Sequence, residues 1–339
     1  MRASFSFQMQ EPAEDGRPWV TLIHGLGMSQ RSWSDPFSER LIGGALSFDY
    51  VLTDLQAPPE IWRLLGARRF GCSPPLRLAN PRPLSFWDFL KREGYGIAGW
   101  SQEKPLGLIE HAVGELQLLL KEIPQRERTV LLGHSRGGLV ARKYLQDRKP
   151  GWERISGLIL LGVPHHGSAI AKLGLLLAQP FSFLENRKSR PFRTRKTQPN
   201  GSFRIRDLAA FRREGGVREL VPGSAFLHRL AAGEGEEGRS KIPYCNVIGT
   251  STDFIRFFLR PSPMGKARPI FSIFDGFQRI IPPSFLPLEI RRGRGDGQVS
   301  VKSARLSWLE KNHFLPINHA QFLVDPEVKN IVRSFLQAI

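Results

Sequence analysis

Cysteine is nearly absent from this chain, since Cys72 and Cys245 are the only two in 339 residues. A scaffold built on several disulfides is therefore excluded. Long apolar runs are also missing, because no stretch of about 18 apolar residues occurs, and we predict no membrane-spanning helix. The segment Met1–Trp19 has neither an apolar h-region nor a small-residue cleavage site. We therefore expect no signal peptide and a cytoplasmic location.

Acidic residues are scarce relative to basic ones: 31 Asp and Glu stand against 49 Lys and Arg, a formal net charge of +18. A polyanionic partner, or simply a basic solvated surface, accounts for such a balance. No helix-turn-helix, zinc-finger or RNP-like pattern occurs, so nucleic acid is not the expected partner. If the partner is a polyanion, we therefore expect an anionic membrane surface.

The chain does contain an alternation of short β-branched runs and helical patterns. Strands are predicted at Val20–His24, Tyr95–Trp100, Thr129–Leu132, Ile155–Leu161 and Tyr244–Ile248. Helices are predicted at Leu108–Ile123, Gly138–Gln146 and Glu327–Ile339. This alternation is typical of a doubly wound, mostly parallel sheet with helices on both faces.

Three insertions interrupt the alternation. Residues 55–90 are rich in proline and arginine, residues 170–240 combine an apolar start with the basic run Arg187–Arg213, and residues 251–290 are rich in Phe, Ile and Pro. The predicted division is a first core part at 1–169, a basic and apolar cap or lid at 170–240, and a second core part at 241–339. We expect residues 170–240 and 251–290 to cover the site, with a partly disordered loop as the alternative.

The strongest motif is Gly133-His134-Ser135-Arg136-Gly137, which follows an apolar strand and precedes a helix. This is the G-x-S-x-G pattern of a nucleophile elbow, in which a sharp turn presents the serine. Glycines flank the serine because a Cβ would clash with the neighbouring strand and helix. The serine also lies at the N-terminus of a predicted helix, where the helix dipole and the free N–H groups favour negative charge. Ser135 is the candidate nucleophile, and a glycine-rich turn without chemistry is the alternative.

A serine hydroxyl needs a base, and the base needs an orienting carboxylate. In this fold both follow the serine, the acid first and the histidine second. His319 lies between the last short apolar segment and the final helix, and it is the candidate base, with His313 as the alternative. Asp296 lies between two glycines and is the candidate acid, with Asp253 and then Asp275 as alternatives.

The developing oxyanion needs two donors that are aimed in advance. The backbone N–H of Arg136, directly after the nucleophile, is one candidate. The backbone N–H of Leu26, in the early loop His24-Gly25-Leu26-Gly27, is the other. His24 itself is expected to be structural.

Three further motifs accompany the glycine loop and the elbow. They are Val163–Ser168, Leu220–Leu227, and Gly295–Val299 together with Asn318-His319. With them the chain resembles the lipase and esterase branch of the α/β-hydrolases, close to bacterial triacylglycerol lipases and to the GPI inositol-deacylase-like group. The resemblance implies the α/β-hydrolase fold, the triad Ser135, Asp296 and His319, and the oxyanion donors Leu26 and Arg136.

The expected activity is hydrolysis of carboxylic esters with a lipid-like acyl group, through an acyl-enzyme and without a cofactor. Acyl transfer by the same triad, or a catalytically inactive membrane- or protein-binding module, are the alternatives. We expect a lipid or ester substrate and peripheral contact with an anionic membrane as partners.

No metal is expected. In many secreted bacterial lipases, acidic or amide side chains after the catalytic histidine help to hold calcium. Here Gln321 and Asp325 lie in that area, and a single acid is thin support. The pair His165-His166 has no acidic or cysteine cluster beside it, and adjacent side chains point in different directions.

Overall fold

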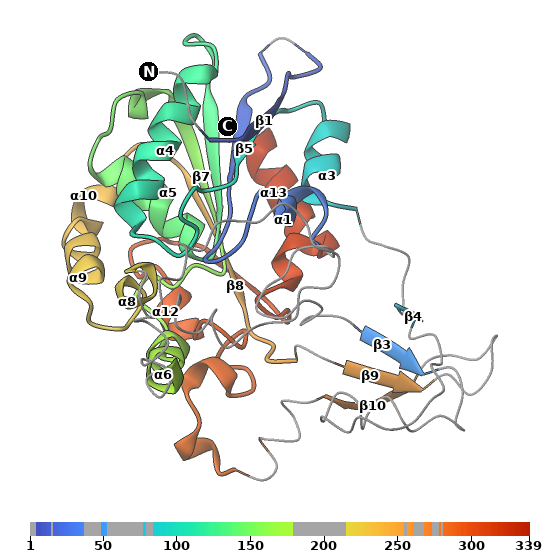
Figure 1. Cartoon of the computed structure of the whole chain (residues 1–339). Coiled ribbons are helices and arrows are strands. Elements are labelled where there is room, and N and C mark those ends of the chain that lie inside the picture. Colours follow the sequence, from blue (N-terminus) through green and yellow to red (C-terminus); the bar gives the residue numbers. More distant parts are fainter. Residues whose placement is uncertain are drawn as a thin grey trace, which may run out of the picture.

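The computed structural model describes residues 5–14, 16–36, 49–52, 77–78, 84–178, 215–253, 256–259, 268–272, 278 and 281–339. A seven-stranded sheet in the order β1-β5-β2-β6-β7-β8-β11 forms the centre (Figure 1). Its strands are β1 (Phe7–Gln10), β2 (Trp19–Ile23), β5 (Gly96–Trp100), β6 (Thr129–His134), β7 (Ile155–Leu161), β8 (Tyr244–Gly249) and β11 (Asn312–Leu315). All neighbours pair in parallel except β1, which is antiparallel to β5. The predicted fold class is thereby confirmed.

Helices cover both faces of this sheet (Figure 1). They are α1 (Arg31–Ser34), α3 (Phe86–Arg92), α4 (Ile109–Glu122), α5 (Arg136–Gln146), α6 (Ala169–Ala178), α8 (Gly216–Glu219), α9 (Ala225–Ala232), α10 (Glu234–Glu237), α12 (Val301–Ala304) and α13 (Pro326–Gln337). Single 3₁₀ turns occur at Trp152–Arg154, Pro283–Phe285, Leu288–Ile290 and Gln321–Leu323. None of the helices among the described residues is long and apolar enough to cross a membrane.

Two buried clusters explain this layering. Alternate residues of a strand point to opposite faces of a sheet. In β6, Leu131 packs with α4 and α5 on one face, whereas Val130 and Leu132 pack with α3 and α13 on the other. The central strands are buried on both faces, so they read in the sequence as continuous apolar runs without alternation.

Local signals define several helix boundaries. Ser85 accepts the Asp88 N–H at 3.0 Å and begins α3. Asp325 accepts the Glu327 N–H at 2.8 Å, and Pro326 occupies the first helical position of α13. Such caps satisfy backbone donors that have no partner inside the helix.

A second, four-stranded sheet joins two of the insertions. It has the order β10-β9-β3-β4, with β3 (Asp49–Leu52), β4 (Arg77–Leu78), β9 (Arg256–Leu259) and β10 (Arg268–Ser272). The parallel pairing of β3 with β9 connects segments that are far apart in the chain. Sequence patterns did not predict this sheet, because each strand is short and its partner is distant.

The predicted cap at 170–240 is described only in part. Residues 179–214, which include the basic run, lie outside the described residues. The segment after them forms α8, α9 and α10, and its buried Phe226 and Leu230 pack into the same cluster as α4 and α5. The division of the chain into core and cap stays a prediction.

Candidate active site

Ser135 lies in the turn between β6 and α5, with φ 54° and ψ −127°. A non-glycine residue at positive φ is strained, and such strain persists only where the surroundings impose it. Here the Ser135 N–H donates to the Leu161 carbonyl at 2.9 Å, and the Ser135 carbonyl accepts the Gly138 N–H at 3.0 Å. The turn therefore holds the serine at the carboxyl end of the sheet and at the start of a helix.

Glycines permit this turn. A Cβ on Gly133 would lie 2.5 Å from the Gly138 nitrogen, and one on Gly137 would lie 2.1 Å from the Ile23 carbonyl oxygen. Both contacts are with backbone, which cannot give way as a side chain can. The helix therefore packs against β6 and β2 at a distance that no larger residue permits.

His319 and Asp296 form a buried pair. The His319 Nδ1–H donates to Asp296 Oδ2 at 2.8 Å, and the His319 N–H donates to the Asp296 carbonyl at 2.9 Å. The other carboxylate oxygen, Oδ1, accepts the N–H groups of Val299 (2.7 Å) and Gln298 (2.9 Å). Each of the two residues is only 1% exposed. The carboxylate is thus oriented by three hydrogen bonds, and the imidazole is left with Nε2 facing away from it.

His134 links this pair to the elbow. Its Nε2–H donates to the His319 carbonyl at 2.9 Å, and the two imidazole rings lie 4.8 Å apart. Burial, with the nearby His319 as a smaller cause, lowers the pKa of His134 to about 3, so it is a neutral donor. Since His134 directly precedes Ser135, the structure brings Ser135, Asp296 and His319 to the same edge of the sheet.

The alternative residues lie elsewhere. His313 is a half-buried residue of β11, in register with Val247. Asp253 contacts the histidine loop through its main chain, since its carbonyl accepts Asn318 Nδ2–H at 2.6 Å. Asp275 lies outside the described residues. Of the candidate acids in the described part of the chain, Asp296 is the one that His319 contacts.

The loop after β2 approaches the serine from the other side. A Cβ on Gly25 would lie 3.2 Å from Ser135 Cβ. The Gly27 N–H donates to the Pro105 carbonyl at 3.0 Å and holds the loop in place. The Leu26 N–H forms no hydrogen bond with any of the described residues. The Arg136 N–H belongs to the first turn of α5, where backbone donors have no partner within the helix.

His24 is fully buried beneath this loop. Its Nδ1–H donates to the Gly25 carbonyl at 2.9 Å, and its Nε2 accepts the Gln102 N–H at 3.0 Å. Burial lowers the pKa of His24 to about 4, and the nearby Arg136 charge adds to this shift. The His24 imidazole is neutral and both of its nitrogens are hydrogen-bonded, so its role is structural.

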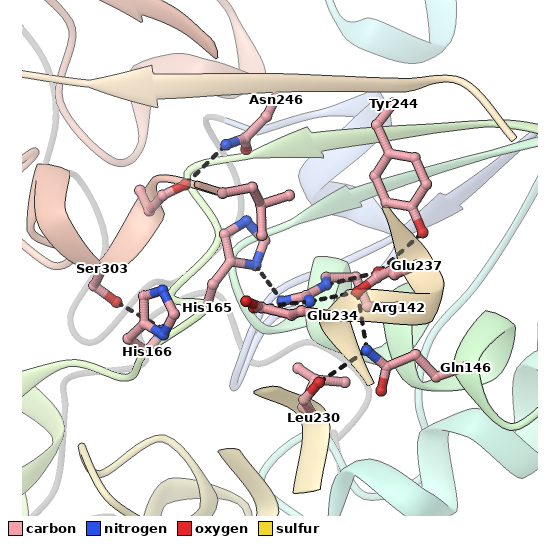
Figure 2. A network of polar contacts seen from close by, with 12 residues as sticks. Arg142, Gln146, His165, His166, Leu230, Glu234, Glu237, Tyr244, Asn246 and Ser303 are labelled. Atoms are coloured by element: carbon pink, nitrogen blue, oxygen red, sulfur yellow. Dashed lines mark hydrogen bonds and ion pairs between the residues drawn. The ribbon is translucent and has the colours of Figure 1, made fainter. Parts of the chain in front are cut away.

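A buried polar network supports the Val163–Ser168 motif, which contains the pair His165-His166 (Figure 2). Arg142 Nε donates to Glu237 at 2.9 Å, and Arg142 Nη1 donates to His165 Nδ1 at 3.1 Å. Burial and the Arg142 charge lower the pKa of His165 well below its ordinary value. Ser168 Oγ–H donates to the Gln298 carbonyl at 2.6 Å, so this motif also supports the loop that carries Asp296.

Two functional features escape sequence reasoning. The Arg136 and Arg142 side chains are both completely buried. Arginine is rarely buried in proteins, so the sequence of this helix does not predict their burial. Their partners come from distant segments. Among the described residues, no group of three or more His, Cys, Asp or Glu is arranged to hold a metal ion.

The model of the PGAP1-like alpha/beta domain family matches residues 14–228. The structure is similar to the mature form of the Bacillus licheniformis lipase BlEst2, with a TM-score of 0.55, 15% identity and 98% of each chain covered. It is also similar to the propeptide form of that lipase, with a TM-score of 0.56, 15% identity, and coverage of 98% of this chain and 53% of the other. No curated protein matches the chain.

At this identity the two lipase structures establish a shared fold. The family model covers well over half of the chain, and the chain therefore belongs to the PGAP1-like α/β domain family.

Proposed function

We propose that this protein is a serine carboxylic-ester hydrolase that acts on lipid-like acyl esters. Ser135 is the nucleophile, His319 the general base and Asp296 the orienting acid. The observation that carries the proposal is the buried 2.8 Å contact between His319 Nδ1 and Asp296 Oδ2, next to a strained serine turn. Nucleophile, base and orienting carboxylate are the three parts that acyl transfer through a serine requires.

In the proposed mechanism, Ser135 Oγ attacks the ester carbonyl carbon while His319 Nε2 takes its proton. The N–H groups of Leu26 and Arg136 stabilise the oxyanion of the tetrahedral intermediate. His319 then returns the proton to the leaving alcohol, and an acyl-enzyme remains. Water, activated by the same imidazole, releases the acid. Asp296 holds the imidazole in the Nδ1–H tautomer and stabilises its cation.

We further propose that the protein contacts an anionic lipid surface near this site. Phe285 is 80% exposed, and Leu288 is also exposed. Arg292 and Arg294 follow at the surface, whereas both acidic residues of 281–303 are buried. Exposed apolar side chains beside exposed cations suit such a surface. Co-sedimentation with anionic and with zwitterionic vesicles tests this, and equal binding to both would contradict it.

The test of the activity is a chain-length series of p-nitrophenyl esters, run on the native protein and on Ser135→Ala. We expect Ser135→Ala to abolish turnover and labelling by a fluorophosphonate probe. The matched control is Ser156→Ala, because Ser156 lies in β7 and its hydroxyl bonds to none of the described residues. Turnover that survives in Ser135→Ala would refute the mechanism.

Fluorophosphonate labelling, together with product analysis in the presence of an added acyl acceptor, separates the alternatives. An inactive binding module would leave Ser135 unlabelled in the native protein. An acyltransferase would be labelled and would pass the acyl group to an added alcohol or amine in preference to water. A steep optimum at long acyl chains would favour lipase over general esterase action.

A further inference from the structure

The Arg136 side chain belongs to the residue directly after the nucleophile, and its burial costs free energy. It is 0% exposed, and among the described residues no carboxylate is hydrogen-bonded to it. Its Nη1 donates to Gln102 Oε1 at 2.5 Å, and its Nη2 donates to the Gly107 carbonyl at 2.6 Å. Burial lowers its pKa to about 10, although the carboxylates of Glu219 and Glu115 oppose the shift from a distance. A buried cation without a paired anion is costly, and an apolar side chain would fill the space more cheaply.

The guanidinium is the start of a relay to the glycine loop. Gln102, which it holds, bonds twice to His24: its backbone N–H donates to His24 Nε2 at 3.0 Å, and its side-chain amide donates to the His24 carbonyl at 3.3 Å. Because Nε2 accepts, the proton of the neutral imidazole is on Nδ1. That Nδ1–H donates to the Gly25 carbonyl at 2.9 Å.

The relay ends at a peptide group. The Gly25 carbonyl and the Leu26 N–H belong to one planar trans peptide, in which they point in opposite directions. Fixing the carbonyl therefore fixes the direction of the N–H. The Gly25 carbonyl also accepts the Met28 N–H at 3.3 Å, so two donors hold it. The Leu26 N–H itself has no acceptor among the described residues and is available for a ligand.

We propose that the Arg136 side chain is a positioning group for the oxyanion hole. Through Gln102 and His24 it sets the direction of the Leu26 N–H, while the backbone N–H of Arg136 is the second donor. Both donors thus depend on one residue, and the unpaired guanidinium charge favours the oxyanion. The inference rests on the proposed function, since it assigns a role within the same site.

The test is Arg136→Met, which keeps the backbone N–H and removes only the side-chain anchor. Complete loss of one oxyanion donor costs about 10²–10³ in kcat, so misaiming one donor should cost about 10- to 100-fold, with KM little changed. Arg136→Lys retains the charge and one of the two hydrogen bonds, so its kcat should lie between that of the native protein and that of Arg136→Met. Gln102→Ala breaks the relay at its second member and should show the same loss.

A second readout separates positioning from loss of structure. The thionocarbonyl sulfur of a thionoester is a poorer hydrogen-bond acceptor than a carbonyl oxygen, so a thionoester gains less from the donors. Both relay variants should therefore lose more activity on the oxygen ester than on its thiono analogue. The control is Arg154→Met, because Arg154 donates to the Leu120 and Pro124 carbonyls, at 2.6 and 2.8 Å, away from the site. It should lower the melting temperature and leave kcat unchanged.

The outcomes are distinct. Folded Arg136→Met or Gln102→Ala protein with native kcat, or with equal losses on both esters, would overturn the inference and leave the proposed function standing. Native protein without ester turnover, or turnover that survives in Ser135→Ala, would instead overturn the proposed function. If Arg136→Met does not fold, Gln102→Ala decides the question, because it leaves the Arg136 bond to Gly107 in place.

Discussion

Acid should destabilise this protein at a pH well above that at which carboxylates titrate. His24 and His134 are fully buried, and burial lowers their pKa values to about 4 and about 3. Burial also lowers the pKa of His165 well below its ordinary value. In the unfolded chain each has a pKa of about 6.5. Below that pH the unfolded state binds more protons than the native state, so the free energy of unfolding falls as the pH falls from 6.5 toward the native pKa values.

The magnitude follows from the same values. Between pH 8 and pH 5, each histidine that stays neutral in the native state and titrates at 6.5 in the unfolded state costs about 2 kcal/mol. Three such residues together cost about 6 kcal/mol. The stability of an ordinary domain is about 5–15 kcal/mol, so this loss is a large part of the whole.

The assay is denaturant unfolding, followed by tryptophan fluorescence at several pH values between 8 and 5. His134→Gln should reduce the change in unfolding free energy by about one third, because one of three titrating groups is gone. Its amide can still donate to the His319 carbonyl, which His134 now contacts. His228→Gln is the control, since His228 is exposed, and it should leave the profile as it is. A change of less than about 1 kcal/mol across this range in the native protein would refute the reasoning.

Three further substitutions test the geometry. Asp296→Asn should lower kcat by about 10⁴ in steady-state assays. The Gln298 and Val299 N–H groups retain the amide oxygen, so the amide NH2 group faces His319 Nδ1 and cannot accept its proton. A loss below about tenfold would contradict the triad. Gly137→Ala places a Cβ 2.1 Å from the Ile23 carbonyl oxygen and should destabilise by about 3 kcal/mol or more in denaturant unfolding. Gly114→Ala, in the exposed part of α4 with nothing within 4 Å of its Cβ, should stabilise by about 0.5–1 kcal/mol, and a lower unfolding midpoint would count against this.

Much of the fold was predictable because its signals are local. The run Ile155–Leu161 coincides with β7, and the pattern Leu108–Ile123 differs from α4 by one residue at each end. The elbow was also recognisable, because Gly133 and Gly137 meet backbone atoms that exclude any Cβ. Periodicity and glycine requirements are properties of a few consecutive residues, so a sequence displays them directly.

Other features depend on which distant segments meet. The sequence by itself determined the order of the elements, the position of the serine turn and a short set of acids and histidines. Only the tertiary structure decided that His319 contacts Asp296, that β3 pairs with β9, and that the Arg136 side chain is buried against Gln102. Hydrogen-bond partners across the chain are set by proximity in three dimensions, and no local pattern encodes that proximity.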